Sequence, residues 1–123
     1  PRELVARWKA LEARRRAAGA HEPTPEEARL DAELRAWPRT DATDPYRAGL
    51  EGFAAELRRA LAPRPVMVAY NEFCAPSVEA AAEMLVAAGA RSVLVVPTMV
   101  IPGGVHSEEE IPETLHALTQ RFE

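Results

Sequence analysis

The residues best suited to chemistry lie in one short segment near the C-terminal end of the sequence. His106 follows the glycine pair Gly103–Gly104 and precedes the acidic run Glu108–Glu110. A neutral imidazole can bind a divalent metal or accept a proton near neutral pH. Two adjacent glycines let the backbone turn tightly and approach a ligand, because no Cβ is in the way. We therefore predict that His106 belongs to a metal-binding or proton-transfer site.

A second carboxylate, Glu72, follows the apolar run Val66–Tyr70. If that run is a buried strand, Glu72 ends it and can supply an oxygen ligand or accept a proton. The alternative is that Glu72 is only an acid near the start of the next helix, where its negative charge interacts favourably with the positive end of the helix dipole. The residues around it leave both interpretations open.

The start of the last helix also has two interpretations. Ser107 and Glu110 have the spacing of a capping box, which predicts that His106 is held just before a helix. Pro112 suits only the first turn of a helix, so it favours a short turn at Ser107–Glu110 and a regular helix from about Ile111.

The remaining candidates have plainer explanations. Cys74 reads as a small hydrophobic residue, since no basic residue lies near it in the sequence. His21 and His116 read as solvated or partly packed residues, and Trp8 and Trp37 as core anchors. The acids Glu108–Glu110 mostly provide helix-start electrostatics, although one of them could attract a cation.

The elements that must position these residues change in character halfway along the chain. Apolar residues at helical spacing predict helices in the first half, and Thr24 and Glu27 form a predicted capping box with Pro25 at the first helical position. Short, β-branched apolar runs predict two buried strands in the second half. The expected order is three helices around Leu4–Leu11, Leu30–Trp37 and Tyr46–Leu61, a strand at Val66–Tyr70, a helix at Val78–Val86, a strand at Val93–Val96 and a helix through Leu115 and Leu118.

A strand, a crossover helix and a second strand form a βαβ unit of a parallel sheet. Ligands in such sheets bind beyond the carboxyl ends of the strands, which are the segments 71–77 and 98–110. Two strands alone make a poor sheet. We expect further strands before Pro1 and perhaps after Glu123, or a partner chain that completes the sheet.

Composition limits the class of protein. The 123 residues carry a net charge of −4, from 15 basic and 19 acidic residues, which argues against a nucleic-acid partner. One cysteine excludes an intrachain disulfide, and no apolar run is long enough to cross a membrane. The sequence predicts a single soluble, cytoplasmic domain over residues 1–123, without common nucleotide-binding or nucleophile motifs.

Three stretches resemble the small class II chelatases, the sirohydrochlorin cobalt- or ferrochelatases. They are Val66–Val78, Leu85–Pro97 and Gly103–Pro112. The resemblance implies an α/β fold, a three-layer chelatase-like (flavodoxin-like) sandwich with a parallel sheet, joined here to a helical N-terminal half. It also implies insertion of Co²⁺ or Fe²⁺ into a sirohydrochlorin-type tetrapyrrole.

On this resemblance His106 and Glu72 are the metal ligands and proton acceptors, and Gly103, Gly104 and Ser107 are predicted ligand-binding positions. The divalent metal (Co²⁺, Fe²⁺ or Ni²⁺) is a substrate, no cofactor is permanently bound, and the other substrate is the tetrapyrrole. Imidazole and carboxylate do not select among these ions. The resemblance also points to a homodimer.

The family also has a second histidine, in a His-Gly segment after the first strand, which in this protein either lies before Pro1 or has been lost. Three hypotheses follow. The chain is a tetrapyrrole metal chelatase, or a non-catalytic metal- or tetrapyrrole-binding protein that has lost half of the site, or a structural domain in which His106 is incidental.

Overall fold

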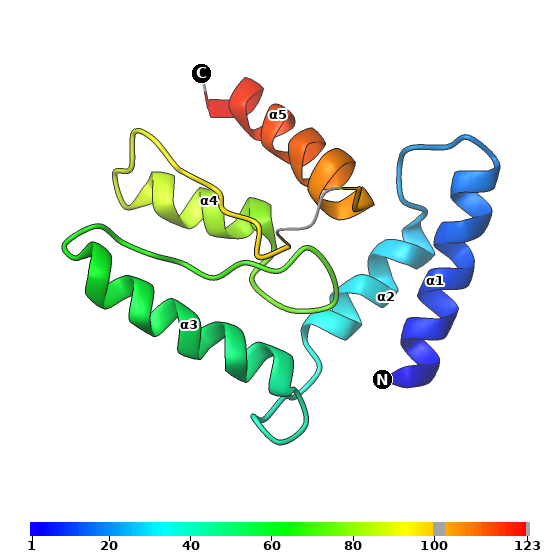
Figure 1. Cartoon of the computed structure of the whole chain (residues 1–123). Coiled ribbons are helices and arrows are strands. Elements are labelled where there is room, and N and C mark those ends of the chain that lie inside the picture. The colour runs from blue at the N-terminus through cyan, green and yellow to red at the C-terminus, as the bar shows by residue number, and fades with distance from the viewer. Residues whose placement is uncertain (100–102, 123) are drawn as a thin grey trace. The chain divides into compact units, whose positions relative to one another are not determined.

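The computed structural model describes residues 1–99 and 103–122, and its regular structure is helical (Figure 1). Helices form where the sequence predicts them. The elements are α1 (Arg2–Ala17), α2 (Pro25–Arg35), α3 (Pro45–Leu61), α4 (Val78–Ala87), the π-helical turn η1 (His106–Glu110) and α5 (Ile111–Phe122).

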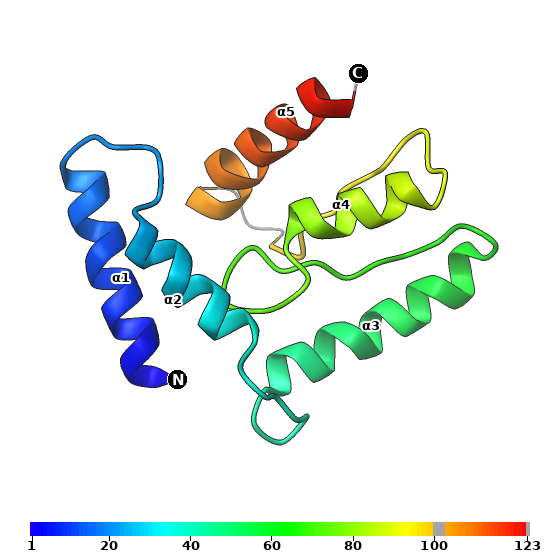
Figure 2. The ribbon, with the colours of Figure 1, turned by 180° about the vertical axis from the view of Figure 1, so that it is seen from behind.

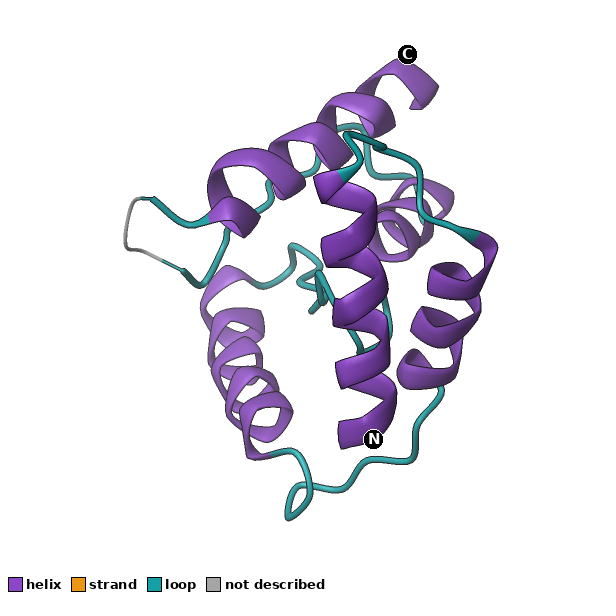
Figure 3. Cartoon of the chain, turned by 90° about the vertical axis from the view of Figure 1, so that its right-hand side faces the viewer, coloured by secondary structure: helices purple, strands orange, loops and turns teal. Residues whose placement is uncertain are grey.

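The predicted parallel sheet is wrong, because no described residue lies in a strand (Figure 3). The segments 66–70 and 93–96 run as loops, and in the second of them Leu94 is 87% and Val96 71% exposed. An extended segment gains the hydrogen bonds of a sheet only beside another strand, and neither segment has such a neighbour within the described ranges. The α/β sandwich is therefore replaced by helices and loops.

The chain divides into two compact units. The first comprises residues 1–53 and 72–75, and the second comprises residues 54–71 and 76–123. Helix α3 contributes to both. The single domain over residues 1–123 stays a prediction.

In the first unit, α1 and α2 pack side by side as an antiparallel hairpin, and the views from both sides agree on this (Figures 1 and 2). The predicted capping box is confirmed: Thr24 Oγ1 accepts from the amide of Glu27, and Glu27 Oε2 accepts from the amide of Thr24. Glu27 is buried and pairs with Arg15 at 2.9 Å. Leu30 and Leu34, both fully buried, form the apolar centre of this hairpin.

In the second unit, α4 packs against α5. Ser77 caps α4 by accepting from the amide of Ala80, because the first amides of a helix have no partner within it. Ala81 on α4 and Leu118 on α5 are buried. The helix ends before Gly89, whose φ of +93° is a conformation that L residues rarely adopt.

Several large apolar side chains are exposed. Helix α3 forms as predicted, and on it Tyr46 is 67% and Phe53 is 54% exposed. Trp37 is 38% exposed and is not a core anchor. Within the described residues, no helix has the length and the apolar character needed to span a membrane.

Candidate functional site

His106 begins a wide helical turn that leads into α5. The amide of Ile111 donates to the carbonyl of His106, five residues earlier, which makes the turn π-helical. Pro112 has no amide hydrogen, and its ring would crowd the carbonyl of Glu108 in a regular α-helix, so the wider turn relieves this conflict. The regular helix starts at Ile111, as the position of Pro112 predicts.

This turn brings His106 and Glu110 together, and a third side chain joins them from the loop after residue 70. Nδ1 of His106 lies 2.5 Å from Oε2 of Glu110. Nδ2 of Asn71 lies 2.7 Å from the same carboxylate oxygen and 3.1 Å from Nδ1 of His106. All three residues belong to the second unit.

The hydrogen-bonding roles follow from the chemistry of the three groups. An ionised carboxylate can only accept, and the Asn71 amide nitrogen can only donate. With the ring proton on Nδ1, Oε2 of Glu110 accepts from both His106 and Asn71, and each donor has an acceptor. This tautomer leaves the lone pair on Nε2 of His106, so Nε2 is the atom that can bind a metal or a proton.

The imidazole is accessible while its carboxylate partner is more covered. The His106 side chain is 40% exposed and that of Glu110 is 23% exposed. A ligand can therefore reach the ring while Glu110 holds it in place. Candidate ligand atoms of His106 and Glu110 lie within 4.8 Å of each other, a spacing compatible with one metal ion.

The residues that precede His106 form a tight turn. Gly103 has a φ of +94°, and its amide donates to Oε1 of Glu108 at 2.5 Å. A Cβ on Gly104 would lie 3.2 Å from Oγ of Ser107. Ser107 Oγ donates to the carbonyl of Gly104, so the predicted capping box between Ser107 and Glu110 is wrong. Ligand binding by Gly103, Gly104 and Ser107 stays a prediction.

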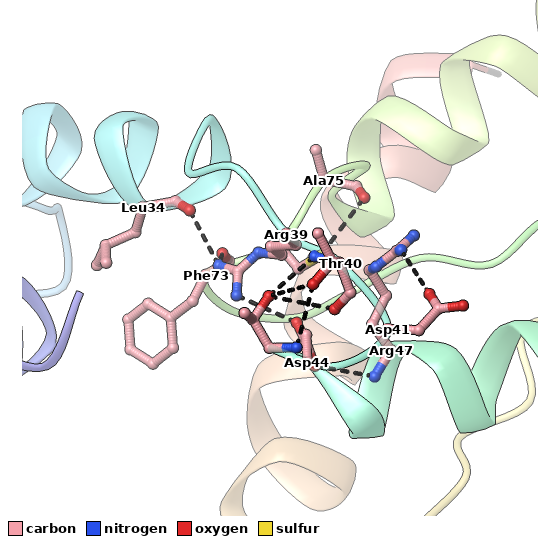
Figure 4. Close-up of polar contacts among 10 residues, drawn as sticks. Leu34, Arg39, Thr40, Asp41, Asp44, Arg47, Phe73 and Ala75 are labelled. Carbon is pink, nitrogen blue, oxygen red and sulfur yellow. Dashed lines mark hydrogen bonds and ion pairs between the residues drawn. The ribbon is translucent and has the colours of Figure 1, made fainter.

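Glu72 is half-buried and is joined to Asn71 by one peptide bond, but it belongs to the first unit. Its carbonyl accepts from the amide of Cys74 at 2.7 Å, and the thiol of Cys74 is buried, as expected of a small hydrophobic residue. Side chains of the first unit hold the carbonyls that follow Glu72. Figure 4 shows Arg39 donating to the carbonyl of Phe73.

The sequence pattern that defines the CbiX family, the small class II chelatases, matches residues 42–123, about two-thirds of the chain. The chain belongs to the CbiX family. Membership assigns it a chelatase-type activity, the insertion of a metal into a tetrapyrrole. The family resemblance inferred from the sequence is thereby confirmed. No curated protein and no solved structure matches the chain significantly.

The CbiX segment contains every residue singled out above as a candidate ligand, whereas α1, α2 and Arg39 precede it. His21 and His116 are exposed, as expected of solvated residues.

The sequence did not predict that Asn71 belongs to this cluster, and it paired Glu110 with Ser107 in a capping box instead of with His106. The signal for Glu110 was its spacing from His106, because residues four apart face each other on a helix. No comparable signal pointed to Asn71, which lies 35 residues before His106.

Proposed function

We propose that this CbiX-family protein inserts Co²⁺ or Fe²⁺ into a sirohydrochlorin-type tetrapyrrole, with Nε2 of His106 as metal ligand and proton acceptor. One observation carries the role of His106: its Nδ1 faces Oε2 of Glu110 at 2.5 Å, so the other ring nitrogen keeps its lone pair. Metal-binding histidines commonly donate their second nitrogen to a carboxylate, which fixes the tautomer and the ring orientation.

Metal insertion replaces two pyrrole N–H protons by one divalent ion, so two protons must leave. Nε2 of His106 presents the ion to the macrocycle. When the ion passes to the pyrrole nitrogens, the freed lone pair on Nε2 accepts one of the protons. The second proton passes to the carboxylate of Glu72, which we propose as the other ligand of the ion before the transfer. Glu110 keeps its orienting hydrogen bonds throughout.

Glu72 enters this proposal through its place in the chain. It follows Asn71, whose side chain contacts both His106 and Glu110. Consecutive α-carbons are about 3.8 Å apart, so Glu72 is tethered to a residue of the His106 cluster. Imidazole and carboxylate bind ions such as Co²⁺ and Fe²⁺, and neither ligand type excludes Ni²⁺. The metal is a substrate in this reaction, and no resident cofactor is required.

The test is the spectral change of sirohydrochlorin when it is mixed with Co²⁺ and protein. His106→Ala should abolish the enzyme-dependent metallation, since it removes the group that presents the ion. His116→Ala is the matched control, because His116 is an exposed histidine on α5 of the same unit. It should metallate at the wild-type rate.

Two outcomes would contradict the proposal. An unchanged rate in His106→Ala would remove His106 from the mechanism. Co²⁺ binding that depends on His106, without metallation by the wild-type protein, would favour a metal-binding protein over an enzyme.

A further inference from the structure

The backbone directly after Glu72 adopts a conformation that few residues tolerate. Phe73 has a φ of +57°, the one such value among the non-glycine residues of the described ranges. The amide of Cys74 donates to the carbonyl of Glu72 at 2.7 Å, which closes a three-residue turn around Phe73. A turn of this kind with a positive φ at its centre is rare and strained, and it persists only where the surroundings hold it.

One arginine holds the carbonyl at the centre of this turn. The guanidinium of Arg39 donates to the carbonyl of Phe73, and also to the carbonyl of Leu34 at 3.0 Å (Figure 4). Its Nη1 pairs with Oδ2 of Asp44 at 3.1 Å, while Oδ1 of Asp44 accepts from the amide of Arg47. The guanidinium is thus held by Leu34 and Asp44 in addition to the turn.

A second arginine holds the carbonyl of Cys74, and an aromatic contact holds the side chain of Phe73. Nη1 of Arg35 donates to the carbonyl of Cys74 at 2.6 Å, and its Nε donates to Asp31 at 2.6 Å. The ring of Phe73 packs edge-to-face on Trp8, with centroids 5.0 Å apart and an angle of 87°. Two consecutive carbonyls and one side chain of the turn are therefore held by α1, α2 and the segment that follows α2.

We propose that Arg35 and Arg39 are positioning residues for Glu72, so that residues outside the CbiX segment set the orientation of a carboxylate within it. The inference rests on the proposed role of Glu72 as a ligand or proton acceptor. Without the two arginines, the strained turn relaxes and the peptide that carries the Glu72 side chain rotates. A displacement of about 1 Å is enough to weaken a site that depends on geometry.

The guanidinium groups suit this task because their planar fork can donate to several oxygens at fixed angles. A lysine carries the same charge but presents a single point donor on a flexible stem. Arg39→Lys therefore keeps the attraction to Asp44 and loses the simultaneous contacts with Leu34 and Phe73. This substitution separates the geometry of the contact from its charge.

The experiment is a double-mutant cycle on Co²⁺ affinity, measured by calorimetry on the full chain. The four proteins are wild type, Arg39→Lys, Glu72→Gln and the double variant. Arg39→Lys should weaken Co²⁺ binding about tenfold, as loss of groups that orient metal ligands does. In the Glu72→Gln background the same change should alter the affinity less than about twofold, because the group it positions is gone.

The matched control is Arg29→Lys, which changes an exposed arginine on α2 that pairs with Glu33 at 3.5 Å. The Co²⁺ affinity of the Arg29→Lys variant should equal that of the wild type. Far-UV circular dichroism checks that each variant is folded. If Arg39→Lys does not fold, the cycle is run with Arg35→Lys, which tests the contact to Cys74.

The outcomes separate this inference from the proposed function. Equal weakening by Arg39→Lys in both backgrounds would show a general structural role and overturn the inference. An unchanged Co²⁺ affinity in Glu72→Gln alone would also overturn the inference. The metallation test of His106 decides the chelatase proposal independently. If Arg39→Lys and Glu72→Gln are coupled in their effect on Co²⁺ affinity but the wild type does not metallate the tetrapyrrole, the positioning role stands. The proposed chelatase activity is then refuted.

Discussion

Replacing Glu110 by glutamine should weaken Co²⁺ binding and slow metallation, although Glu110 itself does not touch the ion in the proposed mechanism. The substitution keeps the shape of the side chain and removes its charge. Oε2 of Glu110 accepts from Nδ1 of His106 and from Nδ2 of Asn71. Both hydrogen bonds therefore change from charge-assisted to neutral.

The size of the effect follows from these two contacts. A hydrogen bond to a charged group contributes about 1.5–3 kcal/mol, and one between neutral groups about 0.5–1.5 kcal/mol. Only the bond to His106 bears directly on the imidazole, whose side chain is 40% exposed, so solvent screening favours the low end of the difference. The low end of that difference, about 1 kcal/mol, corresponds to a roughly fivefold weaker Co²⁺ affinity.

Calorimetric titration with Co²⁺ measures this change, and Glu109→Gln is the matched control. Glu109 is the neighbouring exposed acid, so its substitution makes the same change in net charge. Nitrogen-15 chemical shifts of the imidazole report the tautomer directly. The reasoning is refuted if Glu110→Gln and Glu109→Gln bind Co²⁺ equally, or if the neutral ring of the wild type carries its proton on Nε2.

The remaining predictions concern the first unit, which contains both tryptophans, so tryptophan fluorescence during urea unfolding reports on it. Burial raises the pKa of Glu27, but hydrogen bonds from the Thr24 backbone and from Arg15 outweigh it and hold that pKa below its usual value. The stabilisation is present above about pH 4.3, the ordinary glutamate pKa, and is lost as the pH falls through the lower folded-state value. The stability difference between wild type and Glu27→Gln should therefore shrink on acidification, and a constant difference would contradict this. Leu34→Ala should cost about 2–5 kcal/mol, because it removes a fully buried side chain, and a loss below about 1 kcal/mol would argue against a packed core there.

Helix boundaries could be predicted from the sequence because their signals are local. Thr24 and Glu27 are three residues apart and cap α2 as expected. Pro112 likewise predicted that regular helix begins at Ile111. In each case the interacting groups are within one turn of each other, so the chain determines the outcome without help from distant segments.

The sheet was predicted wrongly because strand pairing is not local. The β-branched run Val93–Val96 has the composition of a buried strand, yet Leu94 and Val96 are exposed in a loop. Composition shows that a segment can form a strand, but the hydrogen bonds come from a neighbour that must lie alongside. The resemblance to the chelatases identified the family correctly, but it does not show which segment could pair with Val93–Val96 as a neighbouring strand.

The candidate site was predicted in part, for the same reason. His106 stood out by its residue type and its position after two glycines, and Glu110 lies on the same turn. Ser107 was expected to cap the helix, but its hydroxyl donates to Gly104 instead. Asn71 comes from a distant loop, so only the folded chain reveals that it shares the carboxylate of Glu110 with the imidazole.

If Glu72 is a metal ligand, as proposed above, a ligand within the family segment depends on residues outside it. Arg35 ends α2 and Arg39 lies in the segment that follows it, and nothing in their spacing predicts a contact with Phe73 or Cys74, more than 30 residues later. The match to the CbiX family begins at residue 42, after both arginines. A relative without them must hold its equivalent turn in another way or leave it relaxed. On the proposal made above, metal affinity in this protein is therefore set jointly by the carboxylate that the family segment provides and by the helices that hold its backbone.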